Sequence, residues 1–145
     1  MDIQITKHFK LSEFLYSDTV DSMKRTCPAL FEAQNSISHE VYMNLYLLCF
    51  YLLEPARECL GMPITINSGY RCPRLNKRVK GSSTSQHLKG EAADITCFDN
   101  LALFNYLKSQ DFDQLIWYGN RVNPPRFIHV SYKFSSNRKM ILYKP

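Results

Sequence analysis

Residues 85–94 of the chain read Ser-Gln-His-Leu-Lys-Gly-Glu-Ala-Ala-Asp, a pattern of the form S-x-H-x-x-G-x-A-x-D. His87 and Asp94 lie seven residues apart, and Gly90 between them allows the chain to turn back so that both side chains reach one metal ion. The small side chains of Ala92 and Ala93 leave room for that approach. The segment therefore predicts a metal-binding turn that leads into a strand.

A third candidate ligand lies further along the chain, in a β-rich run at 127–132. Side chains alternate between the two faces of a strand, so the apolar neighbours of His129 point to one face and His129 points to the other. Two histidines and one aspartate with an open fourth position are typical of catalytic zinc sites. His87, Asp94 and His129 are therefore the candidate metal ligands, and Zn²⁺ is the expected cofactor.

The chain before Gly61 has helical periodicity. Apolar residues recur at helical spacing and predict a buried core helix, at Val41, Leu45, Leu48 and Leu52. We interpret the aromatic residues between them as core residues too, at Tyr42, Tyr46, Phe50 and Tyr51. Pro55 is expected to kink or restart the helix, and Gly61 is expected to end it.

After Gly61 the pattern changes to short β-rich runs. We expect one helix at 101–108, a long polar surface loop at 71–86, and strands at 63–68, 92–97, 114–118, 127–132 and 140–143. The fold class is therefore α+β, with N-terminal helices packed on a small, mostly antiparallel sheet that carries the zinc site.

A chain of 145 residues has the size of one ordinary domain, which we expect to span 1–145. Its net charge of +5 is concentrated in the segments 71–89 and 114–145, which contain no acidic residue. Such segments suit an anionic partner or simply form a solvated face. Nucleic-acid binding is not expected, because no helix-turn-helix, zinc-finger or RNP-type pattern accompanies the charge. The five cysteines are odd in number and lack C-x-x-C spacing, which argues against a disulfide framework.

Three motifs in order resemble those of the M15 metallopeptidases, the zinc D-alanyl-D-alanine peptidases and their phage endolysin relatives. They are S-G-Y-R at 68–71, the histidine motif at 85–94 and H-V-S at 129–131. The resemblance begins at H-F-K-L-S-E-F, at 8–14. It implies a small α+β domain, Zn²⁺ bound by the three candidate ligands, and a peptidoglycan stem peptide as the substrate. The signalling domain of hedgehog proteins resembles these peptidases in its fold and zinc site, although it is not known chiefly as a peptidase.

The resemblance also implies roles for residues around the metal. Arg71 would face the site and bind the substrate carbonyl or the developing oxyanion, and Ser85 would lie beside the ligands and touch the substrate. Relatives carry their acid/base carboxylate at one of two positions, which here hold Arg126 and Tyr118. Asp113 is a nearby carboxylate by sequence, and it is retained with Tyr118 as a candidate catalytic residue.

Two functions follow from these residues. The first is a zinc peptidase that cleaves peptidoglycan stem peptides, either as a D-Ala-D-Ala carboxypeptidase or as an endolysin-type endopeptidase. The second is a zinc-containing binding module of the same fold that has lost catalysis. No apolar run reaches the ~20 residues of a membrane span, and the N-terminus lacks a secretory signal pattern. We therefore expect no membrane span, and a protein that is cytoplasmic until lysis or phage-associated; the oligomeric state is left open.

Overall fold

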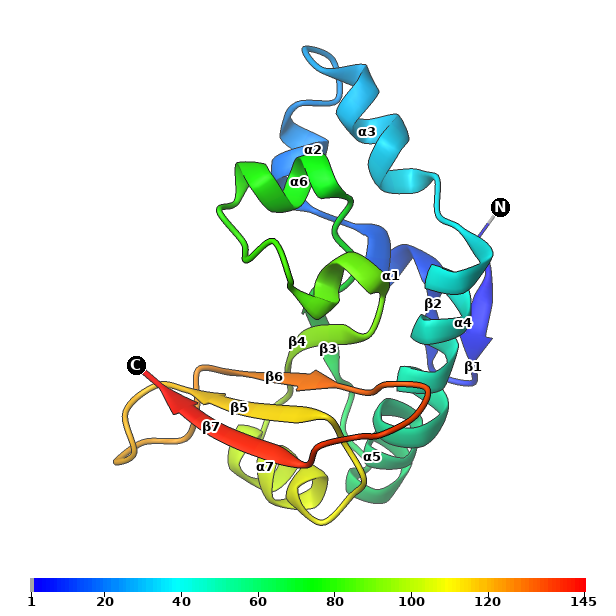
Figure 1. The fold of residues 1–145 in the computed structure, drawn as a ribbon. Helices are drawn as coiled ribbons and strands as arrows, with labels where there is room; N and C mark the ends of the chain where they lie inside the picture. Colours follow the sequence, from blue (N-terminus) through cyan, green and yellow to red (C-terminus); the bar gives the residue numbers. More distant parts are fainter. Residues whose placement is uncertain (1) are drawn as a thin grey trace.

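The computed structural model describes residues 2–145, which form a helical region beside a five-stranded sheet (Figure 1). The α-helices are α1 (Leu11–Leu15), α2 (Asp18–Ser22), α3 (Pro28–Asn35), α4 (His39–Leu48), α5 (Glu54–Leu60), α6 (Pro73–Arg78) and α7 (Asn100–Lys108). A π-helical segment (Cys49–Leu53) joins α4 to α5, and a 3₁₀ helix (Gln86–Lys89) precedes β4. The strands are β1 (Gln4–Thr6), β2 (Phe9–Lys10), β3 (Thr65–Ser68), β4 (Ala92–Thr96), β5 (Gln114–Tyr118), β6 (Phe127–Ser131) and β7 (Met140–Lys144).

The long helical region of the N-terminal half ends at the glycine that the sequence predicts, Gly61. Ser38 caps α4, because its hydroxyl accepts a hydrogen bond of 3.1 Å from the Val41 backbone N–H. Gly61 ends α5 in the left-handed conformation, with φ of 66°. The apolar series that predicts the core helix is buried, which confirms its assignment, at Val41, Leu45, Leu48 and Leu52.

Pro55 explains the π-helical segment between α4 and α5. Proline has no N–H, and in a regular α-helix its ring would clash with the carbonyl of the residue four positions earlier. The chain widens instead, so that the Glu54 N–H donates to the carbonyl of Cys49, five residues before it. Phe50 and Tyr51 are 50% and 48% exposed there, so their interpretation as core residues is wrong.

The segment 71–86 is not a continuous surface loop, and that prediction is wrong. It contains α6, which starts with Pro73 in its first turn, where a missing N–H costs nothing. Leu75 and Asn76 are the buried residues of this helix, and the Asn76 amide donates to the Ser82 carbonyl at 2.9 Å. The contact with Ser82 therefore ties the residues after α6 back to that helix.

The sheet has the strand order β3-β4-β6-β5-β7, and its pairs are antiparallel except for β5 with β7, which are parallel. The predicted α+β class with a mostly antiparallel sheet is therefore confirmed. Side chains of Leu115 and Trp117 in β5 are buried on the face that packs on α7, where the Trp117 ring lies 5.1 Å from that of Phe104. Figure 1 shows α5 and α7 against this face, while α6 lies beyond the other one.

Within residues 2–145, no helix combines the length and the apolar character needed to cross a membrane.

Candidate metal centre

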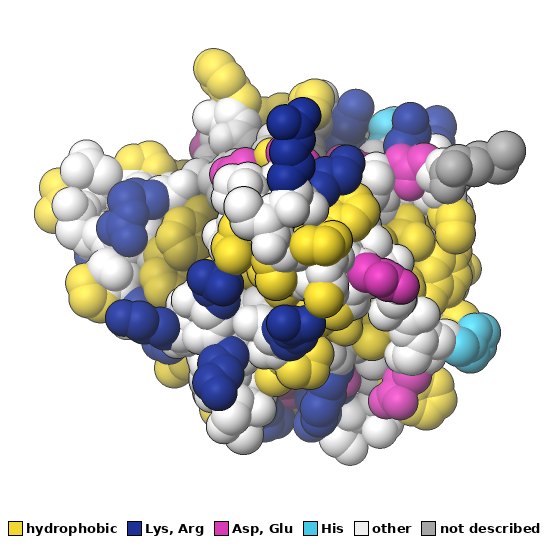
Figure 2. Space-filling view, turned by 90° about the horizontal axis from the view of Figure 1, so that it is seen from above, with side chains coloured by type: hydrophobic (Ala, Val, Ile, Leu, Met, Phe, Trp, Pro, Cys, Tyr) yellow, Lys and Arg dark blue, Asp and Glu magenta, His cyan; other side chains and the backbone are white. Residues whose placement is uncertain are grey.

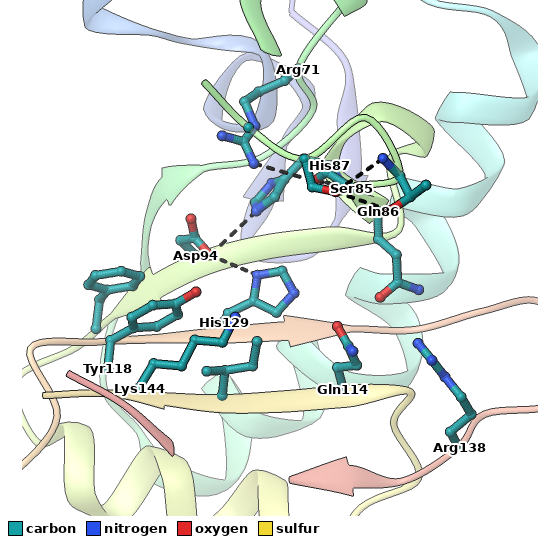
Figure 3. Close-up of a pocket in the computed structure, with 15 residues that line it drawn as sticks. Arg71, Ser85, Gln86, His87, Asp94, Gln114, Tyr118, His129, Arg138 and Lys144 are labelled. Atoms are coloured by element: carbon teal, nitrogen blue, oxygen red, sulfur yellow. Dashed lines mark hydrogen bonds and ion pairs between the residues drawn. The ribbon is translucent and has the colours of Figure 1, made fainter. Parts of the chain in front are cut away.

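The sheet register brings two of the three candidate ligands together. Asp94 in β4 and His129 in β6 are direct cross-strand partners, and Nδ1 of His129 lies 3.0 Å from Oδ1 of Asp94. His87 reaches the same point from the 3₁₀ helix, with its Nε2 3.4 Å from that oxygen (Figure 3). The structure therefore gathers His87, Asp94 and His129 into one cluster on the face of the sheet away from α7.

A backbone carbonyl on the side of the ring away from the cluster fixes the orientation of His87. Its Nδ1 lies 2.7 Å from the backbone carbonyl of Gly69, which can only accept, so Nδ1 carries the proton and Nε2 faces the cluster. Gly69 itself lies so close to α1 that a Cβ there would sit 2.6 Å from the Phe14 carbonyl oxygen. Metal-bound histidines commonly donate their second N–H to a carbonyl in this way.

The protonation states of the cluster suit a metal. Burial raises the pKa of Asp94, but the neighbouring imidazoles of His129 and His87 outweigh it and hold the pKa well below its usual range. Burial lowers the pKa of His129, an effect that exceeds the opposing influence of Asp94. At neutral pH the cluster therefore offers an ionised carboxylate and a neutral imidazole, the forms that bind metal ions.

The spacing of the cluster fits a tetrahedral ion. Metal bonds of about 2.0–2.1 Å at tetrahedral angles separate the ligand atoms by about 3.3–3.4 Å. The three candidate atoms all lie within 4.8 Å of one another, and the His87–Asp94 separation already matches. This nitrogen and oxygen donor set with one open position is the kind that binds Zn²⁺ in enzymes.

A second group of possible ligands lies away from this face, at His8, Glu54 and Glu58. There the two carboxylate oxygens of Glu54 are already engaged, one by the His8 backbone N–H at 2.8 Å and the other by the His8 ring at 2.5 Å. This pair ties the β1–β2 turn to the start of α5. His8 is half-buried and His39 is exposed.

The cluster lies in a cleft of about 640 Å³ across the sheet face. Alternate residues of β5 form its floor, at Gln114, Ile116 and Tyr118. The polar segment after α6 forms a wall, at Ser82, Thr84 and Ser85. In Figure 3 the metal cluster occupies the middle, with Tyr118 and Lys144 toward one end and Gln114 and Arg138 toward the other. Among the described residues that line the cleft, Asp94 is the one carboxylate.

Arg71 reaches the cleft from a clamped loop. The buried amide of Gln34 in α3 donates to the Tyr70 carbonyl at 2.7 Å and accepts from the Cys72 N–H at 2.9 Å, one residue on each side of Arg71. The Arg71 guanidinium donates to the Ser85 hydroxyl at 3.4 Å, while the buried Nε of Arg71 has no partner among the described residues. Arg71 and Ser85 therefore both line the cleft. No sequence motif reveals the supporting role of Gln34.

Tyr118 lines the cleft and stacks on Phe127, with ring centroids 4.4 Å apart. Burial and the charge of Asp94 raise the pKa of Tyr118, against a smaller opposing effect of Arg71. At neutral pH its hydroxyl is therefore a hydrogen-bond donor and not a base.

Asp113 does not line the cleft. Its side chain is fully buried, and it accepts hydrogen bonds from Arg138 at 3.0 and 2.7 Å and from Gln86 at 3.0 Å. The carboxylate is thus enclosed by its partners and does not face the cleft. The sequence does not single out Gln86 or Arg138 as site residues, although the position of Gln86 next to His87 could have indicated that it lies near the site.

The comparison with protein families agrees with this geometry. The family model described as Peptidase M15 matches residues 7–131, which include all three candidate ligands. The chain belongs to the peptidase M15 family, and the resemblance seen in the sequence is confirmed.

The chain is also similar to one zinc peptidase of known name. Over 50 residues, the chain is 40% identical to the zinc D-Ala-D-Ala carboxypeptidase of Streptomyces albus G. That match covers 34% of this chain and 20% of the relative, so the chain aligns with only about a fifth of that protein's length. The metal in the relative's name is the one that the donor set here favours.

Proposed function

We propose that the protein is a zinc peptidase that cleaves peptidoglycan stem peptides at or near their D-Ala-D-Ala end. The observation that carries the proposal is the cluster of His87, Asp94 and His129 in an open cleft, with His87 oriented by the Gly69 carbonyl. Membership in the M15 family supports the peptidase class, and the relative's name supports the metal and the bond.

In this proposal His87, Asp94 and His129 would hold Zn²⁺, and the ion would supply a lowered water pKa of ~7 and polarisation of a carbonyl. Arg71 donates hydrogen bonds to the carbonyl oxygen of the scissile bond as negative charge develops on it. The Tyr118 hydroxyl, protonated at neutral pH, donates from the other side. Ser85 holds the Arg71 guanidinium in place through the hydrogen bond between them.

The surface charge supports an anionic partner such as the bacterial cell wall. Arg74, Lys77 and Arg78 line a depression on α6, the helix beyond the open face of the sheet. In Figure 2, seen from above, dark blue side chains spread across the face and magenta ones lie mostly on its right side. Peptidoglycan and its attached polymers carry negative groups that such a surface attracts.

The test is digestion of purified muropeptides by the zinc-loaded protein, with products identified by mass spectrometry. We expect release of a terminal D-Ala or a cut within the stem, and no product from a His129→Gln variant. His39→Gln is the matched control, because His39 is exposed. Intact muropeptides after incubation with fully metal-loaded wild type would refute the proposal.

A second candidate is a zinc-containing binding module without turnover. The observation that favours it is that Asp94 is the one carboxylate among the described cleft-lining residues, so none is left to accept a proton from water. Under this reading the wild type binds stem peptides without cleaving them, and Tyr118→Glu creates activity. Under the first reading the wild type cleaves, and Tyr118→Phe lowers kcat by about 100-fold through loss of the donor.

A further inference from the structure

The end of the cleft away from Tyr118 carries three polar side chains from three separate segments. Gln86 descends from the 3₁₀ helix, Gln114 rises from β5, and Arg138 comes from the segment before β7 (Figure 3). The family match ends at residue 131, so Arg138 lies outside it.

Arg138 is held rigidly at the cleft by a carboxylate that solvent does not reach. Its Nε and Nη2 donate to the two oxygens of Asp113 at 3.0 and 2.7 Å, and its backbone N–H donates to Oδ1 at 3.0 Å. Asp113 is fully buried, whereas the Arg138 side chain is 49% exposed. A guanidinium has five N–H donors in one plane, so this geometry leaves the donors of Nη1 and one of Nη2 free.

Gln86 offers an acceptor at the same end. Its Nε2 donates to Asp113 Oδ2 at 3.0 Å and to Glu91 Oε1 at 3.4 Å. An ionised carboxylate can only accept, so the contact with Asp113 fixes the amide orientation and turns Oε1 the other way. Gln86 Oε1 is buried and has no partner among the described residues. A buried acceptor without a partner is costly unless a ligand supplies a donor.

An unpaired acceptor beside a preoriented guanidinium matches the N–H and the carboxylate of an amino-acid residue. We propose that Gln86 and Arg138 form the subsite for a carboxylate-bearing residue of the substrate peptide, with Asp113 as the positioning residue that fixes both. Arg138 binds the carboxylate and Gln86 Oε1 accepts the peptide N–H. The inference rests on the proposed function and specifies which part of the peptide this end of the cleft recognises.

The charges around the cleft agree with that assignment. Of the described residues that line it, Arg71, Arg138 and Lys144 are positively charged and Asp94 alone is acidic. Two sources of a carboxylate exist in a stem peptide: the C-terminal D-Ala and the α-carboxylate of the internal D-Glu. Both present the same chemistry to Arg138, and the experiment separates them.

The probe is the pentapeptide L-Ala-γ-D-Glu-L-Lys-D-Ala-D-Ala in three forms: unmodified, amidated at the C-terminus, and amidated at the D-Glu α-carboxylate. For each form, kcat/KM is measured with zinc-loaded protein. The dissociation constant is measured by titration calorimetry with metal-free protein, which reports binding without turnover. We expect wild type to lose about 10- to 100-fold for one amidated form, which identifies the source of the carboxylate.

The variant must not leave Asp113 as a lone buried charge, because that alone can unfold the protein. The double variant Asp113→Asn/Arg138→Gln therefore replaces the ion pair by two amides that can still pair. It should bind all three peptides equally, at the level of the form that wild type disfavours. Lys139→Gln is the control for the loss of a positive side chain next to Arg138, since Lys139 is exposed and does not line the cleft. It should discriminate as wild type does.

The outcomes separate this inference from the proposed function. If wild type binds and cleaves all three forms alike, or if the double variant still discriminates, the subsite is wrong while the peptidase remains. If wild type neither binds nor cleaves any form, the proposed function fails and the subsite fails with it. A melting curve of the double variant within a few degrees of wild type shows that lost discrimination is not lost folding.

Discussion

At the scale of single residues, the metal cluster depends on a glycine that is not a ligand. Gly69 follows β3 and passes so close to α1 that only a hydrogen fits on its Cα. That approach allows the Gly69 carbonyl to reach His87 Nδ1 and the Tyr70 N–H to donate to the Phe14 carbonyl at 2.8 Å. The position of one backbone carbonyl therefore decides which nitrogen of His87 faces the metal.

Gly69→Ala should weaken zinc binding by about 10- to 100-fold, because the added methyl moves the carbonyl that orients His87. Competition with a chromogenic chelator measures the affinity. Gly61→Ala is the control, since Gly61 has a positive φ but open space around its Cα. It should cost about 1 kcal/mol of stability and leave the zinc affinity unchanged. Equal affinities for the two variants would contradict the role given to Gly69.

Asp113 gives a second prediction at this scale. Burial raises its pKa, but the hydrogen bonds from Arg138 and Gln86 outweigh that effect and lower it. A lowered folded-state pKa adds stability above the unfolded value of about 3.9, and this stability is lost as the pH falls through the folded pKa. Urea unfolding from pH 7 down to pH 3 should therefore show a steeper loss below about pH 4 in wild type than in Asp113→Asn. Parallel curves would show that folding does not lower the pKa of Asp113.

At the scale of elements, the π-helical segment sorts neighbouring side chains to opposite sides. One extra residue in the turn before Pro55 places Leu52 and Leu53 in the core and leaves Phe50 and Tyr51 half exposed. The exposed rings pack on one another, and Tyr51 also stacks on Tyr132 with centroids 5.0 Å apart. The turn thus fixes how α4 and α5 meet the sheet.

Leu52→Ala should destabilise the protein by about 2–5 kcal/mol, because a fully buried leucine is replaced by a cavity. Phe50→Ser, two residues away, should cost about 1 kcal/mol or less, since half of its surface is already in water and only ring contacts are lost. Urea unfolding curves of both variants measure the difference. A larger loss for Phe50→Ser would mean that the segment is a regular α-helix with the rings inside.

At the scale of the whole molecule, the metal cluster joins parts of the chain that are folded by different means. Asp94 and His129 are fixed by strand pairing. His87 and Arg71 are instead fixed through the loop at 69–72, which is hydrogen-bonded to α1 and α3. An ion bound to all three ligands therefore connects the sheet to the helical region. Any ligand that binds only the folded state stabilises it.

Zinc at 100 times its dissociation constant should add about 2.7 kcal/mol to the free energy of unfolding. For a chain of this length that corresponds to a rise in Tm of about 8 °C. Calorimetric scans with zinc and with a chelator measure the shift, which His129→Gln should abolish and His39→Gln should retain. A wild-type Tm that does not respond to zinc would show that the cluster is not a metal site.

Much of the candidate site is local in sequence and so is predictable. The histidine motif encodes a turn with Gly90 in the left-handed conformation, φ 75°, followed by a strand of small residues. Alternation within β6 places His129 on the same face as Asp94. The turn and the strand alternation depend on residues only a few positions apart, so they can be predicted from the sequence alone.

What the sequence alone determined is the α+β class, the strands, the core helix that ends near Gly61, and the three residues that meet at one point. The tertiary structure decided the rest, because each remaining contact joins residues far apart in the chain. It decided that α6 forms within a polar stretch, that Gln34 clamps the Arg71 loop, and that Asp113 is enclosed by Gln86 and Arg138 instead of facing a substrate. Hydrogen bonds of this kind satisfy buried polar groups, and their partners are known only once the chain has packed.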